Sequence, residues 1–193
     1  SAPYIVRDLL RWQADLLRRV DRGNEAEGVM RRAVDLLDGT RAQLVETVDW
    51  LMEREAWSLI EEMAGNFPER FEENAALLYR MAELQVRRGE EELAEETADR
   101  AVKTNQDDHQ EHIEAAYSLQ ERGLFKWSER ESRHVMKLAP SGSLHELRSR
   151  FLLSEMLHDL ERELPAAEIL QAVVDNMEKD KNVVHTAARM RRN

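Results

Sequence analysis

Gly89 and Gly123 lie 34 residues apart, and this spacing limits the possible fold more than any other feature of the sequence. Before each glycine stands a stretch of helix-forming residues, and a second stretch follows it. The first pair reads AALLYRMAELQVRRG and EEELAEETADRAVKT, and the second pair reads HIEAAYSLQERG and LFKWSERESRHVMKLAP. A period of this length is typical of stacked helical hairpins, each of which buries its apolar face against its neighbours.

The rest of the sequence also favours helices. Apolar residues recur at spacings of three and four, as in Leu77, Met81 and Leu84, which places them on one face of a helix. Alternating apolar and polar stretches, the pattern of half-buried strands, are short. We therefore predict an all-α chain of helices joined by short loops.

The two hairpins resemble units of the tetratricopeptide repeat (TPR) family, a helix–turn–helix unit with small residues where its two helices cross. The matching residues are Leu78, Met81, Ala82, Gly89, Ala94, Ala98 and Ala101 in the first hairpin, and Ala115, Ala116, Leu119, Gly123, Ser128, Ser132, Val135 and Pro140 in the second. Small side chains let two helices approach to about 8–10 Å. The resemblance implies a TPR-like α-solenoid, in which antiparallel hairpins form a right-handed superhelix.

The resemblance covers about 170 residues in five units, two of them strong matches, and the whole sequence is predicted to be one domain, 1–193. Its units are 7–37, 40–68, 75–108, 109–142 and 147–177, followed by the start of a further helix at 182–193. The unit 40–68 lacks the turn glycine, so the register of its first helix stays open. Segments 68–74 and 141–143 are predicted to be longer loops between hairpins. The alternative is another α-solenoid or an irregular helical bundle.

Composition excludes several kinds of function. The sequence has no Cys, so it holds no disulfide, thiolate nucleophile or Cys-based zinc site. Its formal net charge of −11 argues against a nonspecific nucleic-acid binder, which needs clustered positive charge. The longest apolar runs are far shorter than the ~20 residues of a membrane span.

No catalytic motif stands out in the sequence. His109 and His112 lie three residues apart, whereas the zinc-binding HExxH helix needs a spacing of four, so we expect a loop and a helix start there, capped by Asp107 or Asp108. We predict no enzyme activity, no cofactor and no metal site. The compartment stays unassigned, with the cytoplasm as the default.

The predicted function is a protein-interaction scaffold that binds a peptide or a helix, within a longer chain. In TPR proteins the first helix of each hairpin lines a concave groove, and the resemblance places Tyr79, Ile113 and Phe151 at one groove position in successive hairpins. The candidate partner-binding residues are Arg11, Arg18, Tyr79, Glu83, Ile113, Tyr117, Phe151 and Glu155. The alternative for each large residue is packing between neighbouring hairpins.

Two further hypotheses concern charge and self-association. Arg7, Arg11, Arg18 and Arg22 share one helix face that either holds acidic groups or pairs internally with Asp8 and Asp15. The alternative function is a structural module that self-associates without a peptide ligand, by burying Trp50, Trp57 or Trp127 between copies.

Overall fold

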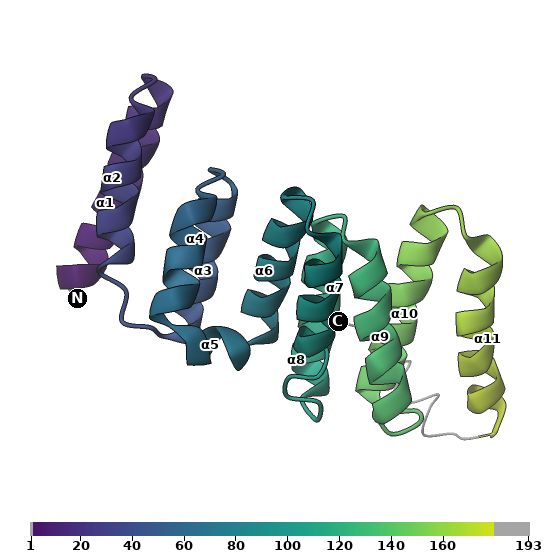
Figure 1. The fold of residues 1–193 in the computed structure, drawn as a ribbon. Coiled ribbons are helices and arrows are strands. Elements are labelled where there is room, and N and C mark those ends of the chain that lie inside the picture. The colour runs from purple at the N-terminus through teal and green to yellow at the C-terminus, as the bar shows by residue number, and fades with distance from the viewer. Residues whose placement is uncertain (1, 180–193) are drawn as a thin grey trace. The chain divides into compact units, whose positions relative to one another are not determined.

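The computed structural model describes residues 2–179, and the secondary structure in this range is entirely α-helical (Figure 1). The helices are α1 (Ala2–Arg19), α2 (Gly23–Val34), α3 (Arg41–Met52), α4 (Trp57–Asn66), α5 (Pro68–Glu72), α6 (Ala75–Arg87), α7 (Glu91–Ala101), α8 (His109–Glu121), α9 (Phe125–Leu138), α10 (Leu144–Asp159) and α11 (Glu163–Lys179). This confirms the all-α prediction. The helix start predicted at 182–193 lies outside the described residues.

The chain divides into two compact units, Ser1–Ala101 and Val102–Asn193. The first unit contains the hairpins α1–α2, α3–α4 and α6–α7, with the short helix α5 before the third. The second unit contains the hairpins α8–α9 and α10–α11. A single domain over 1–193, and the right-handed superhelix, stay predictions.

The turns inside the hairpins keep one register through both units. Asp21, Glu55, Gly89 and Gly123 have φ between 55° and 78° and follow one another at intervals of 34 residues. Glu161 takes the same conformation, with φ 58°, after an interval of 38 residues. The four extra residues of that interval agree with the longer loop predicted at 141–143.

Each of these five turns ends its helix with the same backbone hydrogen bond. The amide after the left-handed residue donates to the carbonyl five positions earlier, the long-range bond of the Schellman motif. The five pairs are Arg22 with Leu17, Ala56 with Leu51, Glu90 with Gln85, Leu124 with Leu119, and Arg162 with Leu157, at 2.8–3.0 Å. The register that the sequence left open in 40–68 is thereby fixed, because Glu55 occupies the glycine position.

Residues 68–74 differ from the predicted loop, because Pro68 begins the short helix α5. Proline suits the first position of a helix, where its missing amide leaves no bond unmade. Phe71 from α5 is buried in the core of the first unit. This aromatic anchor accounts for helical structure in a stretch rich in charged residues.

The small residues predicted at the helix crossings lie in the core. Ala82, Ala94, Ala98 and Ala116 are fully buried, and Ser128 and Ser132 almost so. The Ser128 hydroxyl donates to the Ala116 carbonyl at 2.8 Å, and the Ser154 hydroxyl donates to that of Ala166 at 3.2 Å. These two bonds join the helices of each hairpin in the second unit, as close helix approach requires.

Candidate protein-interaction surfaces

The first helices of the second unit present a solvent-accessible face at the predicted groove positions. We define the α8–α10 face as Ile113 and Tyr117 of α8 with Phe151 and Glu155 of α10. Tyr117 is 55% exposed, Phe151 is 36% exposed, Glu155 is exposed and Ile113 is half-buried. The opposite sides of both helices carry core residues such as Ala116 and Leu153. The α8–α10 face is therefore available to a partner.

The predicted groove residues of α6, in the first unit, are buried. Tyr79 is only 1% exposed, and Glu83 is buried and lies 3.3 Å from an Arg87 guanidinium nitrogen. Tyr79 thus fits the packing alternative, and neither residue offers an accessible contact. Of the three residues predicted at one groove position in successive hairpins, Ile113 and Phe151 are therefore the two that solvent reaches.

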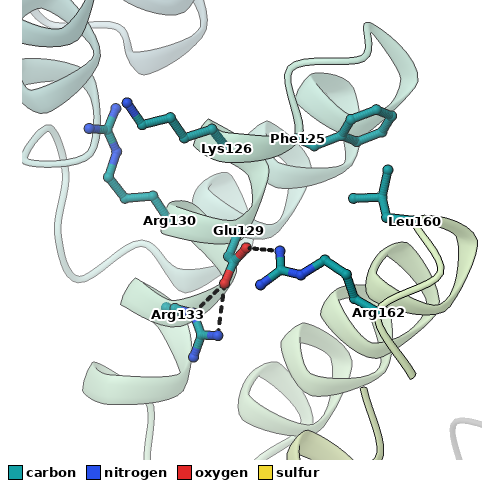
Figure 2. Close-up of a pocket in the computed structure, with 7 residues that line it drawn as sticks. All are labelled: Phe125, Lys126, Glu129, Arg130, Arg133, Leu160 and Arg162. Atoms are coloured by element: carbon teal, nitrogen blue, oxygen red, sulfur yellow. Dashed lines mark hydrogen bonds and ion pairs between the residues drawn. The ribbon is translucent and has the colours of Figure 1, made fainter. Parts of the chain in front are cut away.

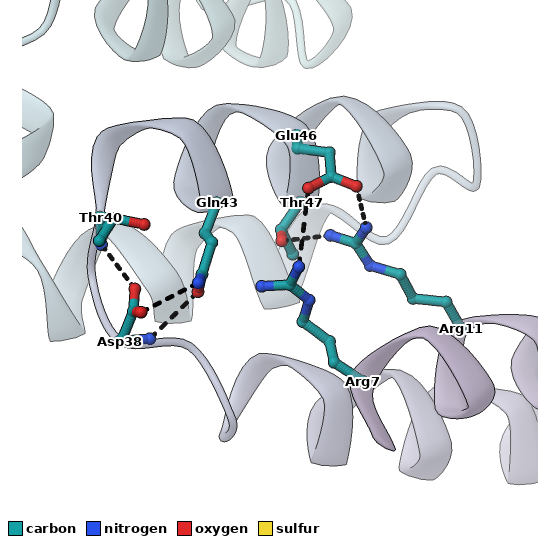
Figure 3. A network of polar contacts seen from close by, with 7 residues as sticks. All are labelled: Arg7, Arg11, Asp38, Thr40, Gln43, Glu46 and Thr47. Carbon is teal, nitrogen blue, oxygen red and sulfur yellow. Dashed lines mark hydrogen bonds and ion pairs between the residues drawn. The ribbon is translucent and has the colours of Figure 1, made fainter. Parts of the chain in front are cut away.

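Two residues of the arginine face, Arg7 and Arg11, point from α1 towards Glu46 of α3 (Figure 3). Arg11 donates to Glu46 at 2.6 Å and to the Thr47 hydroxyl at 2.5 Å. Arg7 is 2% exposed and approaches the same Glu46 at 3.8 Å. Arg11 therefore holds the first hairpin against the second, which leaves it little capacity for a partner.

The other residues of that arginine face have separate surroundings. Asp15 accepts from Arg54 of the α3–α4 turn at 2.5 Å, and Arg22 donates to Glu25 at 2.6 Å. Arg18 is exposed. Of the two arginines predicted to bind a partner, only Arg18 is accessible.

A second face of α1 is apolar and exposed. We define the outer face of α1 as Ile5, Leu9, Trp12 and Leu16, with Val20 just beyond the helix end; these side chains are 45–63% exposed. The core side of the same helix carries Leu10, Ala14 and Leu17. The sequence analysis did not identify this face, although residues at spacings of four, three and four carry its signal. It is a large apolar surface of the kind that marks interaction sites.

The tryptophans predicted to mediate self-association are less exposed than Trp12, which is 63% exposed. Trp127 is buried in the second unit, and Trp50 and Trp57 are half-buried. Trp50 also lies under the guanidinium groups of Arg11 and Arg54, with ring distances of 5.4 and 4.9 Å. Trp12 is thus the tryptophan available for a contact between copies.

A cationic pocket of about 530 Å³ lies beside α9 and the α10–α11 turn in the second unit (Figure 2). Its lining residues are Phe125, Lys126, Glu129, Arg130, Arg133, Leu160 and Arg162. Glu129 accepts from Arg133 at 2.9 Å and from Arg162 at 3.0 Å. Burial raises the pKa of Glu129, but these two arginines outweigh it and lower the pKa.

Three arginines and a lysine around one glutamate make this pocket suited to a carboxylate with an apolar neighbour, which would contact Phe125 and Leu160. The pocket could not be recognised in the sequence, because Glu129 and Arg162 are 33 residues apart. Only the fold brings them together.

A pair of histidines lies between α8 and α9, with His112 buried and His134 half-buried. His112 Nδ1 lies 2.7 Å from Glu131 Oε2, both side chains are fully buried, and the rings of His112 and His134 are 4.6 Å apart. Burial lowers the pKa of His112, but the hydrogen bond and charge of Glu131 outweigh it and raise the pKa. Burial and the neighbouring His112 lower the pKa of His134.

No group of three or more His, Asp or Glu residues in the described range is arranged to hold a metal ion. His109 begins α8, and Asp108 caps it by accepting from the Glu111 amide at 3.0 Å, which confirms the predicted helix start. Within residues 2–179, no helix combines the length and apolarity that crossing a membrane requires.

No family model and no curated protein matches the sequence. Among solved structures, the chain is similar to YrrB, described as a TPR protein with an unusual peptide-binding site, at 18% identity, covering 91% of this chain and 88% of that one, with a TM-score of 0.37. It is also similar to MamA, at 11% identity, 93% and 97% coverage and a TM-score of 0.42. MamA from Desulfovibrio magneticus RS-1 is 13% identical, with 91% and 97% coverage and a TM-score of 0.42.

The geometry of this chain identifies its fold. The turn register, the repeated helix cap and the small residues at the crossings are those expected of TPR units. The fold is TPR-like, built of antiparallel helix hairpins.

Proposed function

We propose that this chain is a non-catalytic protein-interaction scaffold whose α8–α10 face binds an extended peptide or a partner helix. The observation that carries the proposal is the exposure of Tyr117 and Phe151 on neighbouring first helices. Large aromatic side chains on rigid helices are the usual anchors of protein interfaces, because they bury much area and lose little conformational entropy.

Energetics and chemistry of the face support an amphipathic ligand. Complete burial of one such ring contributes roughly 1.5–3 kcal/mol, so two rings together supply enough for a micromolar complex only if polar contacts add to them. Glu155 lies one turn after Phe151 and is exposed, so it can accept hydrogen bonds from a peptide backbone or a basic side chain. We therefore expect ligands with alternating apolar and donor groups.

Selection from a displayed random-peptide library tests this proposal. Peptides recovered with the wild-type chain are measured by calorimetry against the Tyr117→Ala/Phe151→Ala double variant. We expect at least a tenfold loss of affinity, about 1.4 kcal/mol, with unchanged helicity by circular dichroism. Leu164→Ala is the matched control, because Leu164 is 70% exposed and belongs to α11, which contributes no residue to the α8–α10 face.

The result that contradicts the proposal is a set of peptides that bind the double variant as tightly as the wild type. Arg162→Ala then tests whether such peptides occupy the cationic pocket instead. The remaining predicted contact residues, Arg18 among them, are examined in the same assay.

A further inference from the structure

The outer face of α1 is the largest apolar feature exposed by the first unit. Its residues Ile5, Leu9, Trp12 and Leu16 follow at spacings of four, three and four, the seam by which one helix packs along another. Hairpin repeats bury their apolar surface by packing against other helices. None of the described helices covers the outer face of α1, whose side chains are 45–63% exposed, so this face calls for a covering helix.

Charges beside the seam indicate which helix fits. Asp8 flanks the first half of the outer face and Arg19 flanks the second half, on the same side of the helix. Both residues are exposed, and no ion pair of either occurs among residues 2–179. The flank thus changes from negative to positive along α1.

We propose that the outer face of α1 packs antiparallel against α1 of a second copy of this chain. In an antiparallel pair, Leu9 faces the partner helix near its Leu16, and the two Trp12 rings meet close to the two-fold axis. Asp8 of each copy then lies within reach of Arg19 of the other, which makes two opposite-charge pairs. In a two-fold symmetric parallel pair, the flanks that carry Asp8 and Arg19 would lie on opposite sides of the contact, so the two residues could not pair.

The exposed apolar area of the face indicates how strong the contact is. Its four aliphatic side chains and Trp12 are 45–63% exposed. Taking about half of ~100 Å² for each aliphatic side chain and of ~200 Å² for the tryptophan gives roughly 300 Å² per copy. Two copies bury roughly 600 Å² of apolar surface, which is the range of a weak association that depends on concentration.

This contact is separate from the α8–α10 face, since it uses only α1 of the first unit. Failure of one proposal therefore leaves the other intact. Pairing through α1 would double the number of peptide-binding faces in one assembly, and bivalent binding raises the apparent affinity without any new contact.

Sedimentation equilibrium over a concentration series tests the proposal with the whole chain. We expect the average mass to rise from one chain towards two, and Trp12→Glu to hold it at one chain. Trp12 is exposed, so circular dichroism of this variant should match the wild type. Leu164→Glu, a change of equal chemistry at an exposed site on α11, should leave the association unchanged.

Charge reversal tests the antiparallel orientation. Asp8→Arg alone and Arg19→Asp alone should each weaken association roughly fivefold or more, because each change makes two like-charge pairs. The double variant Asp8→Arg/Arg19→Asp should restore it. A wild-type mass of one chain at every concentration, or a dimer insensitive to Trp12→Glu, overturns the proposed contact. A double variant no better than the single ones overturns the antiparallel orientation.

Discussion

The left-handed turn position gives a prediction in which one substitution has opposite effects at two sites. Gly89 has φ 78° at the α6–α7 turn, and a Cβ added there meets no atom within 4 Å. Gly28 lies inside α2 of the same unit, and an added Cβ there is equally free of contacts. Glycine-to-alanine changes at these two sites therefore differ only in backbone conformation.

The expected magnitudes follow from that conformation. In Gly89→Ala, the left-handed backbone costs an alanine about 1–2 kcal/mol, and the lower entropy of the unfolded chain offsets about 0.4–1 kcal/mol of it. The net loss of stability is about 1 kcal/mol. In Gly28→Ala, the higher helix propensity of alanine adds about 1 kcal/mol. The two variants should thus differ by about 2 kcal/mol, with opposite signs.

Urea unfolding followed by circular dichroism measures this difference. Hairpin repeats can unfold in steps, so the comparison uses the transition of the first unit, which contains both sites. The midpoint of Gly89→Ala should fall below that of the wild type, and the midpoint of Gly28→Ala should rise above it. Two shifts of the same sign would refute the assignment of Gly89 to a turn that requires a left-handed residue.

Two further predictions concern the second unit. Glu131→Gln should lower the pKa of His112 in an NMR titration and flatten the dependence of stability on pH. The reason is that a raised His112 pKa adds stability below about pH 6.5, which is lost as the pH rises through the folded-state pKa. An unchanged His112 titration would contradict the pairing of His112 with Glu131. Ala116→Trp should lower the free energy of unfolding by about 1–3 kcal/mol or more, because the larger side chain overpacks the helix crossing where the Ser128 hydroxyl donates to the Ala116 carbonyl. The control Glu121→Trp, at an exposed site, should leave the free energy of unfolding nearly unchanged. Equal effects of the two substitutions would contradict the predicted crossing.

The helical hairpins could be predicted from the sequence because their determinants are local and periodic. Gly89 and Gly123 mark two turns by residue type, and the small residues around Ala82 and Ala116 mark two crossings. Asp21, Glu55 and Glu161 adopt the same left-handed conformation without glycine, so residue type alone did not reveal their turns. For Asp21 and Glu55 the interval of 34 residues carries the signal, once the pattern is read as positions rather than as glycines, whereas Glu161 follows Gly123 after 38 residues.

Accessibility of the candidate site could not be predicted in the same way. Tyr79 and Tyr117 both lie on first helices at positions assigned to a groove, but Tyr79 is buried and Tyr117 is exposed. The difference depends on which side chains from other helices cover each ring, and these come from distant parts of the sequence. The bonds of Arg11 to Glu46 and Thr47, across 35 and 36 residues, are hidden from sequence reasoning for the same reason.

The outer face of α1 shows what a two-faced helix implies. A helix at the surface of a folded domain usually carries one apolar stripe, because the opposite side faces water. On α1, Leu10 and Leu17 occupy the core side while Leu9 and Leu16 are exposed, so adjacent leucines, which are about 100° apart around the helix, face different surroundings. Core packing of this hairpin explains only the first pair. A covering helix would give the second pair a packing role, and the opposed charges of Asp8 and Arg19 favour an antiparallel copy of α1 as that helix.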